Sequence, residues 1–285
     1  MSVLHALVLG IVQGLTEFLP VSSSGHLILT RILLGINDAA AGAGAYLIFD
    51  ILLHVGTLAA VVIVFWNDWW EMIRHLFRSR LFLLLVIASV PALIAALLFD
   101  DLIEGLFTGW FLGISFLFTS VLLILAEFVS QRQRSAKREP TVMTSVVMGC
   151  FQAVALLPGV SRSGASITGG LLSGLDRKAA AKFSFMMSAP AILGSLLFEG
   201  KAALENGYLQ YLEPLTAAVG IAAAGISGYF AIRFMLRLIE RASLNWFALY
   251  TATLGLLVLC LQLAGHPAVP AFRLPEAAAM LRRML

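Results

Sequence analysis

Long apolar segments separated by short polar loops follow one another along almost the whole chain. A helix needs roughly 20 residues to cross about 30 Å of hydrocarbon. On this basis the pattern predicts six membrane spans, at 46–66, 81–99, 110–128, 183–198, 214–236 and 244–264. The tail after Pro267 is predicted to be an interfacial segment.

Two further apolar stretches are interrupted by Pro, Ser and Gly. The first consists of residues 3–19 and 26–35 around PVSSSG, and the second covers 141–174 around PGVSRSG. Residues 26–35 are too few to span a membrane. Each stretch is therefore predicted to form a re-entrant helical hairpin with the polar motif at its tip.

The two interrupted stretches are distorted copies of each other. Residues 9–35 align with 148–174 at a shift of 139 positions. The identities at this shift are Gly10 with Gly149, Gln13 with Gln152, Val21-Ser22 with Val160-Ser161, Ser24-Gly25 with Ser163-Gly164, Ile28 with Ile167, and Gly35 with Gly174. Matching broken segments in two halves are a sequence indicator of a membrane protein's binding site.

The repeat predicts one membrane domain, 1–285, built from two halves at 1–139 and 140–285. Because three spans separate the hairpins, the second hairpin must enter the membrane from the side opposite to the first. The predicted fold is an all-α polytopic membrane protein with two inverted-topology repeats, each a re-entrant hairpin followed by three transmembrane helices.

The composition supports the membrane assignment. The chain is 60% hydrophobic and 12% charged, with a mean hydropathy of +0.94, which excludes an ordinary soluble domain. Its two cysteines, Cys150 and Cys260, lie in apolar runs, so neither a disulfide nor a cysteine metal cluster is expected. The basic runs lack the length and aromatic residues of a nucleic-acid surface.

Charges separate the loops into two sets. Loops predicted on one side carry Arg74, Arg78, Arg80, Arg132, Arg134, Lys137, Arg138, Arg177, Lys178, Lys182, Arg233, Arg237 and Arg241. The other side carries Asp100, Asp101, Glu104, Glu199, Glu205 and Glu213 against Lys201. The positive-inside rule makes the basic side cytoplasmic, so the mouth of the first hairpin is predicted to face outward.

The ionisable residues within the two hairpins are Glu17, His26 and Arg162. Such residues inside a membrane are functional candidates, and non-helical backbone at membrane depth has to line a cavity or be buried in protein. The two tips are therefore predicted to share a polar cavity. The Arg162 guanidinium suits phosphate, since its planar fork donates parallel hydrogen bonds, and a helix N-terminus after the glycine would attract the same anion.

The first hairpin adds candidates for metal binding and for nucleophilic attack. Gln13 and Glu17, four residues apart, share a helix face and could hold Mg²⁺ or Ca²⁺ that bridges to a substrate phosphate. Ser22, Ser23 and Ser24 precede His26, which permits either a serine activated by histidine or a histidine that attacks phosphorus itself.

Each candidate also has a structural interpretation. Glu17 and Arg162 could simply pair across the two halves, His26 could be a packed residue at a helix start, and the SSSG motif could be a helix cap. The small residues of the SxSG motif could serve helix packing alone. The functional interpretation is favoured because acid, hydroxyls, imidazole and guanidinium occur together in two related turns.

Three other sets of polar residues are assigned structural roles. His54 lies four residues after Asp50 and could assist the site, but a structural polar pair is the favoured interpretation. Glu127 is expected to snorkel or to pair with a nearby basic residue. Asp176, Arg177 and Lys178 are expected to form a solvated cytoplasmic cap.

The two motifs resemble those of the undecaprenyl-diphosphate phosphatase family of bacterial membranes, the bacitracin-resistance type. Its motifs read (E/Q)xxxE, then PVSSxGH, and PGxSRSxxT. This chain has Gln13 to Glu17, then PVSSSGH ending at His26, and PGVSRSGAS ending at Ser166. The resemblance covers essentially the whole chain. Gln13 takes the less acidic option, and Ser166 stands where threonine is usual.

The resemblance implies hydrolysis of the terminal phosphate of a C55 polyprenyl diphosphate, which regenerates the lipid carrier for peptidoglycan synthesis. Glu17 would serve a divalent cation or transfer protons, Arg162 would clamp the diphosphate, and Ser23 or His26 would be the nucleophile or its base. Further phosphate contacts are expected from Ser22, Ser24, Ser161, Ser163, Gly164 and Ser166. The site would lie in the bacterial inner membrane and face the periplasm or the cell exterior.

Two other functions share part of this sequence pattern. Inverted repeats with broken helices are also typical of transporters, so a polyprenyl-phosphate transporter or flippase is the second hypothesis. A second membrane phosphatase superfamily shares PSGH and SR fragments, but its K-x6-RP motif does not precede SSSGH here. The expected partners are the polyprenyl diphosphate and membrane lipid, with a homodimer left open and no nucleic acid.

Overall fold

The computed structural model describes residues 1–36, 43–75, 78–99, 109–133, 136, 138–207, 212–266 and 269–270. Within these ranges every regular element is an α-helix, as predicted. The helices are α1 (Val3–Phe18), α2 (Ser23–Leu33), α4 (Ala43–Val64), α5 (Trp66–Arg74), α6 (Arg80–Leu98), α8 (Leu112–Arg132), α9 (Val142–Val154), α10 (Arg162–Leu172), α11 (Arg177–Glu205), α12 (Pro214–Leu238) and α13 (Asn245–Leu263). Most of the predicted interfacial tail, the acidic loop at 100–104, Arg134 and Lys137 lie outside the described residues.

Five helices in the described ranges are long and apolar enough to cross a membrane: α6, α8, α11, α12 and α13. A sixth span results if α4 and α5, which are bent by 79° relative to each other, are counted together. Many large apolar side chains point outward, such as Leu97 and Leu98 of α6, which are 62% and 71% exposed. Such a surface is suited to lipid rather than water, so the chain is a multi-pass membrane protein.

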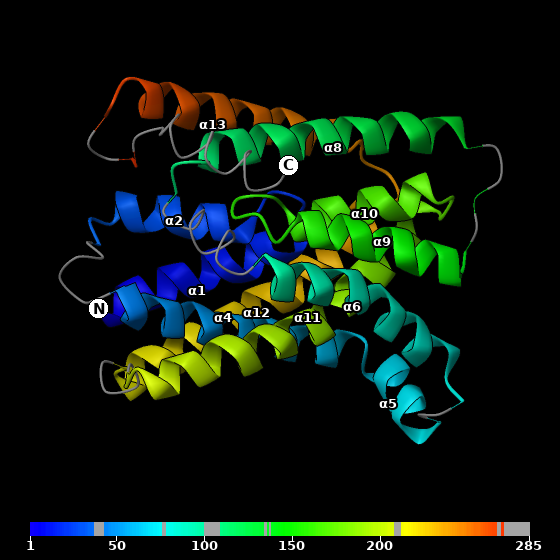
Figure 1. Ribbon diagram of the computed structural model, residues 1–285, viewed down its shortest axis with the longest axis horizontal. Helices are drawn as coiled ribbons and strands as arrows, with labels where there is room; N and C mark the ends of the chain where they lie inside the picture. The colour runs from blue at the N-terminus through cyan, green and yellow to red at the C-terminus, as the bar shows by residue number, and fades with distance from the viewer. Residues whose placement is uncertain are drawn as a thin grey trace.

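The short helix α5 was not predicted from the sequence. The apolar run was expected to reach Trp66, but α4 ends at Val64 and α5 turns away, protruding from the bundle (Figure 1). Trp66 and Trp70 stack with ring centroids 6.2 Å apart, and the Arg74 guanidinium lies 4.8 Å from the Trp70 ring. Exposed tryptophans beside a basic residue are typical of the membrane–water interface.

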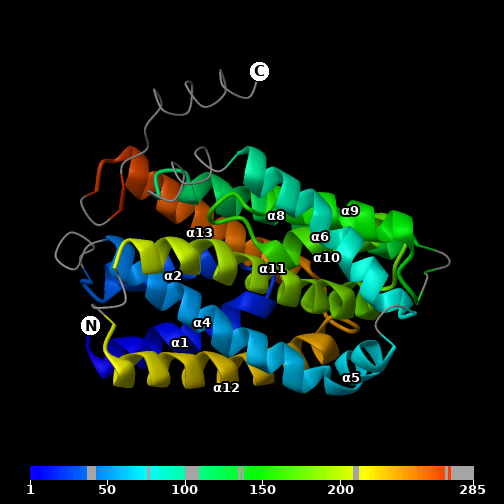
Figure 2. The same cartoon turned by 60° about the horizontal axis from the view of Figure 1, so that its bottom comes forward.

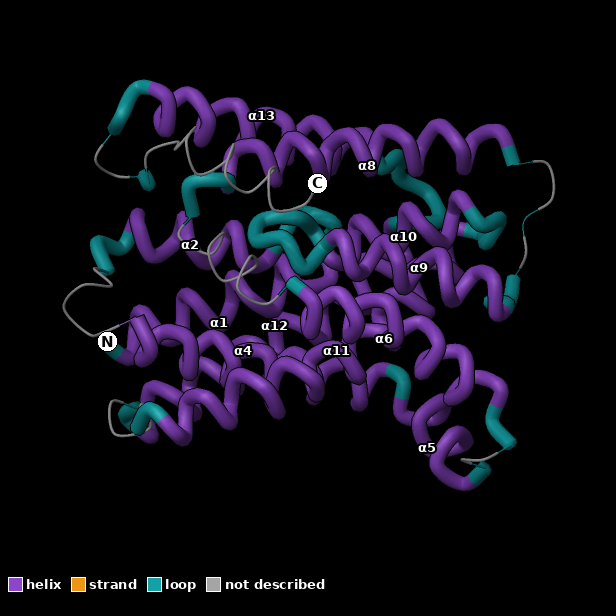
Figure 3. The backbone as a smooth tube through the Cα atoms, in the orientation of Figure 1, coloured by secondary structure: helices purple, strands orange, loops and turns teal. Residues whose placement is uncertain are grey.

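Two helical hairpins, α1 with α2 and α9 with α10, approach each other with their tips. The first opens at the left of Figure 1 and the second at the right, and their connecting loops lie together near the middle (Figure 3). The Ser163 hydroxyl donates to the Leu19 carbonyl at 2.9 Å, and the Gly159 amide donates to the Ser24 hydroxyl at 3.3 Å. The predicted meeting of the tips is therefore present, whereas their inverted insertion into a membrane stays a prediction.

Helix α12 of the second half packs closely against α1 and α4 of the first half (Figure 2). A Cβ atom added to Gly14 would lie 2.0 Å from the Ser227 hydroxyl and 2.4 Å from the Ala224 carbonyl oxygen. One added to Gly56 would lie 2.3 Å from the Ile221 carbonyl oxygen. Small residues thus let the backbones approach, which is how helices associate without a hydrophobic driving force.

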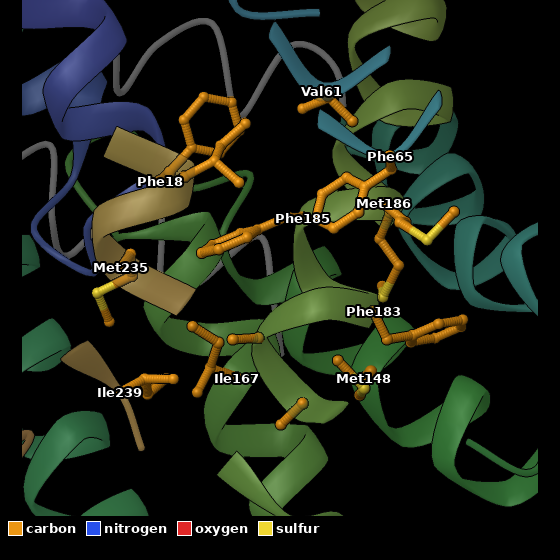
Figure 4. Packing of buried hydrophobic residues seen from close by; sticks show 14 of the residues in the cluster. Phe18, Val61, Phe65, Met148, Ile167, Phe183, Phe185, Met186, Met235 and Ile239 are labelled. Atoms are coloured by element: carbon orange, nitrogen blue, oxygen red, sulfur yellow. The ribbon is translucent and has the colours of Figure 1, made fainter. Parts of the chain in front are cut away.

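An apolar cluster lies next to the hairpin tips and draws on both halves (Figure 4). Phe18, the last residue of α1, packs edge-on against Phe185 of α11 with ring centroids 5.5 Å apart. Both side chains are fully buried, together with Ile167 of α10 and Met148 of α9. This packing fixes the end of α1 and thereby the position of the preceding residue, Glu17.

A buried ion pair between Arg177 and Glu127 lies outside the hairpin tips. Arg177 contacts the Glu127 carboxylate at 2.9 Å, and Glu127 also accepts from the Leu244 amide at 2.8 Å. The expected pairing of Glu127 is confirmed. The interpretation of Arg177 as part of a solvated cap is wrong, because its side chain is only 19% exposed and joins α11 to α8.

Candidate active site

The turn between α1 and α2 has an unusual backbone. Helix α1 ends at Phe18, and Leu19 is extended (φ −73°, ψ 144°), as a residue before proline prefers. Ser22 has φ 74° and ψ 102°, the one positive φ at a non-glycine residue within the described ranges. Its hydroxyl accepts from the Gly25 amide at 3.3 Å and caps α2. Backbone strain of about 1–3 kcal/mol is typically stored at functional sites.

In the turn between α9 and α10, the residue with a positive φ is a glycine. Gly159 takes the positive φ, 84°. The Ser161 hydroxyl accepts from the Gly164 amide at 3.0 Å and caps α10. Each cap makes the next residue the first of a helix: Ser23 in the first hairpin and Arg162, 139 positions later, in the second.

A cavity of about 170 Å³ lies where the two tips meet. Its lining comes from α1, α2, α4, the second turn, α10 and α11, namely Thr16, Glu17, Ser23, Ser24, His54, Ala155, Val160, Ser161, Arg162, Ala191, Ile192 and Ser195. The structure thus brings together an acid and hydroxyls of the first hairpin with the guanidinium of the second.

Glu17 is the most highly connected polar group of the cavity. Its Oε1 accepts from Arg162 Nη2 at 2.5 Å, and its Oε2 accepts from the Ser23 hydroxyl at 2.6 Å and from Gln13 Nε2 at 3.0 Å. The side chain is only 6% exposed. A buried carboxylate requires such partners, and Ser23 is held with its proton directed at a base.

Arg162 is fixed at both ends of its guanidinium. Nη2 contacts Glu17, and Nη1 donates to the Ser184 carbonyl of α11 at 3.2 Å. The structural pairing of Glu17 with Arg162 between the two halves is therefore present. Because the pair borders a cavity that also contains hydroxyls and an imidazole, its function need not end with pairing.

His26 lies apart from the groups that line the cavity. Its Nδ1 contacts the Ser22 carbonyl at 2.7 Å, and its Nε2 contacts the Tyr250 hydroxyl of α13 at 2.7 Å. The His26 and Tyr250 rings also stack, with centroids 5.7 Å apart. Both ring nitrogens are thus engaged, and the role of His26 as nucleophile or base stays a prediction.

His54 of α4 occupies the place that the sequence suggested for His26. Its Nδ1 contacts the Asp50 backbone carbonyl at 2.7 Å, and its Nε2 lies 3.8 Å from Glu17 Oε2. The Asp50 carboxylate pairs with Arg31 of α2 instead. The favoured interpretation of His54 and Asp50 as a polar side-chain pair is therefore wrong, whereas the alternative that His54 assists the site stays a prediction. An ionisable residue within a predicted span was the available signal.

The predicted phosphate-binding residues fall into two groups. Ser24 and Ser161 line the cavity. The others use their polar atoms to hold the turns: Ser22 and Gly164 take part in the helix caps, Ser163 donates to Leu19, and the Ser166 hydroxyl donates to the Arg162 carbonyl at 2.7 Å. Direct contacts of this second group with phosphate stay predictions.

Gln13 and Glu17 are the only two predicted metal ligands, and the structure adds one observation about them. The Gln13 side chain is buried, and its Oε1 has no hydrogen-bond partner in the described part of the chain. The described residues contain no cluster of three or more His, Cys, Asp and Glu side chains that could hold a metal ion. A cation held by these two residues would complete its coordination with oxygen atoms of water or substrate.

Comparison with known proteins gives one family over most of the chain. Residues 6–257 match the model of the family described as "Bacitracin resistance protein BacA". The undecaprenyl-diphosphatase of Carboxydothermus hydrogenoformans is 42% identical over 270 residues, which cover 93% of this chain and 99% of that protein. The undecaprenyl-diphosphatases of Halothermothrix orenii and Alkaliphilus metalliredigens are 40% and 39% identical, cover 92% of this chain, and are matched over 98% and 100% of their own length.

Proposed function

The chain belongs to the bacitracin resistance protein BacA family, and from this premise we infer that it is a membrane enzyme that hydrolyses undecaprenyl diphosphate to undecaprenyl phosphate and inorganic phosphate. The observation that carries the inference is the cavity at the hairpin tips, where Glu17, Ser23 and Arg162 converge. The reaction would regenerate the lipid carrier for peptidoglycan synthesis.

The arrangement of these residues fits phosphoryl transfer. The reaction depends on positioning and charge neutralisation, and the Arg162 guanidinium at the N-terminus of α10 offers both to a diphosphate. The Ser23 hydroxyl donates a hydrogen bond to Glu17, which favours Ser23 over His26 as the nucleophile. Attack of Ser23 Oγ on the terminal phosphorus would release undecaprenyl phosphate, and water would then release inorganic phosphate.

A direct assay tests the function. Protein purified in detergent should release phosphate from farnesyl or undecaprenyl diphosphate. In proteoliposomes, movement of a polyprenyl phosphate without release of phosphate from the diphosphate would support the transporter hypothesis and contradict the proposed one. No feature of the described residues favours the transporter over the phosphatase.

The identity of the nucleophile can be read from a trapped intermediate. Acid quenching during turnover of radiolabelled substrate should leave a phosphoenzyme that resists acid and maps to Ser23, because phosphoserine is stable in acid and phosphohistidine is not. Ser23→Ala should abolish the label, and His26→Gln should retain it. An acid-labile label that disappears in His26→Gln would assign the attack to His26 instead.

We also propose that a divalent cation, Mg²⁺ or Ca²⁺, assists the reaction. Glu17 and Gln13 are the residues that would hold it, and the unpartnered Gln13 Oε1 supports this choice. When bound, the cation would neutralise charge on the diphosphate. Gln13 supplies an uncharged oxygen, so the protein's own affinity for the ion should be modest.

Removal of the cation should therefore lower activity. Incubation with excess chelator is expected to reduce phosphate release at least about tenfold, since a bound metal typically supplies several kcal/mol of charge stabilisation. Added Mg²⁺ or Ca²⁺ should restore the rate, and Gln13→Glu should lower the concentration needed. Chelator already saturated with Ca²⁺ is the matched control. An unchanged rate after exhaustive chelation would contradict the metal proposal.

The side of the membrane is a further proposal. The basic ends of α5, α8, α11 and α12 lie at the right of Figure 1, and the N-terminus lies at the left. By the positive-inside rule the right end would face the cytoplasm of a bacterial inner membrane, and the first hairpin would open to the periplasm or exterior.

A further inference from the structure

The cavity contains an imidazole that the proposed reaction has not yet used. His54 reaches the cavity from α4 and is 32% exposed. Its Nδ1 lies 2.7 Å from the Asp50 backbone carbonyl, which can only accept a hydrogen bond. The hydrogen-bond partner therefore assigns the proton of a neutral ring to Nδ1. Nε2 is then the unprotonated nitrogen, and it lies 3.8 Å from Glu17 Oε2.

Glu17 has little capacity to keep a proton. Its Oε1 is paired with Arg162 and its Oε2 already accepts from Ser23 and Gln13. Protonation would replace a charge-assisted pair with a neutral acid beside an arginine, which weakens the hydrogen bonds that position Arg162. A second base next to Oε2 would keep the carboxylate ionised during the reaction.

We propose that His54 is a positioning residue of the phosphatase reaction that takes the Ser23 proton from Glu17 and later returns it. This proposal rests on the proposed function. As Ser23 Oγ bonds to the terminal phosphorus, its proton passes to Glu17 Oε2 and on to His54 Nε2. The electron pair of the broken P–O bond leaves with undecaprenyl phosphate.

Hydrolysis of the phosphoserine closes the cycle. Water adds to phosphorus, both of its protons end on inorganic phosphate, and the P–Oγ bond breaks. Ser23 then recovers its proton from His54 through Glu17. The free enzyme is restored with Nε2 unprotonated, and no further reactant is needed.

The surroundings of His54 leave Glu17 as its proton partner. The charged groups that face it are Glu17 of α1 and Arg162 of α10, with the Asp50–Arg31 pair one turn away along α4. Other elements contribute uncharged groups: α11 lines the cavity with Ala191, Ile192 and Ser195, and α12 meets α4 through small residues around Gly56.

Two substitutions test the proposal in the full-length protein. His54→Gln keeps a polar side chain of similar size but cannot carry the proton. Its kcat for farnesyl diphosphate should fall by roughly 100-fold, the low end of the range for acid–base groups, while KM changes little.

Chemical rescue separates a proton-transfer role from a structural one. His54→Ala should regain activity when imidazole is added, because the partly exposed side chain leaves an open path. His75→Gln, at the exposed end of α5, is the matched control and should equal the wild type. A wild-type kcat in His54→Gln would overturn the proposal, as would an inactive His54→Ala that imidazole does not rescue. Failure of the proposed function would show differently, as absence of phosphate release from the wild type.

Discussion

Arg162→Ala should lower kcat for phosphate release by roughly 100- to 1,000-fold, the loss typical for removal of one preorganised donor to a developing charge. The guanidinium stands at the first position of α10, anchored on Glu17 and on the Ser184 carbonyl. It can therefore meet a diphosphate without prior rearrangement of the backbone. Phosphate release by purified protein, measured at saturating farnesyl diphosphate, is the test.

Removal of Arg162 also leaves Glu17 as a buried charge without its counter-ion, at a cost of about 3–5 kcal/mol. Arg162→Lys separates folding from catalysis, because it keeps the charge but loses the planar fork. This variant should remain monodisperse in gel filtration and still lose at least about tenfold in kcat. Arg233→Ala, on the exposed surface of α12, is the matched control and should be fully active. Full activity of Arg162→Lys and Arg162→Ala would refute the clamp.

Glu17→Gln should lower kcat by at least about 100-fold, the range expected for a general base. The amide keeps the shape of the side chain and can still accept from Arg162 or Ser23. It cannot take the Ser23 proton, and it removes the one charged ligand available to a cation. Phosphate release measures the activity, and thermal unfolding of the same preparation shows whether the variant is folded.

The pair of Glu127 with Arg177 in the same chain is a structural ion pair with which Glu17 can be compared. Glu127 is also buried and paired with an arginine, but it does not line the cavity. Glu127→Gln should lower the unfolding temperature and leave kcat of the folded protein unchanged. Glu17→Gln should instead fold and be inactive. A Glu17→Gln protein with normal kcat would leave only the structural interpretation of Glu17.

The repeat made the hairpins predictable, because prolines, glycines and capping serines break a helix by local rules. The same shift placed Ser23 and Arg162 at equivalent helix starts, and the i,i+4 spacing placed Gln13 beside Glu17. These features depend only on near neighbours in the sequence. For this reason the acid, the hydroxyl and the guanidinium of the cavity could be named before their contacts were known.

The contacts that could not be predicted depend on how each helix is rotated about its axis and on how the helices pack against one another. His54 reaches Glu17 because Gly56 lets α12 pack tightly on α4 and so fixes which face of α4 meets the tips. His26 turns away because Ser22 has a positive φ and Tyr250 approaches from α13. The bend into α5 follows from an amphipathic Trp-rich segment that hydropathy alone merges with the preceding span. The sequence marks His54 only as an ionisable residue within a predicted span, and the contacts themselves join helices that are far apart in the chain.

The position of α12 bears on how this molecule could move. Because α12 belongs to the second half yet packs backbone to backbone on α1 and α4 of the first, the halves are interlocked at Gly10, Gly14 and Gly56. Alternating access by rocking one half against the other would have to break these close backbone contacts. Entry of substrate and exit of product are therefore expected to rely on local opening at the hairpin tips, with the bundle itself as a fixed frame.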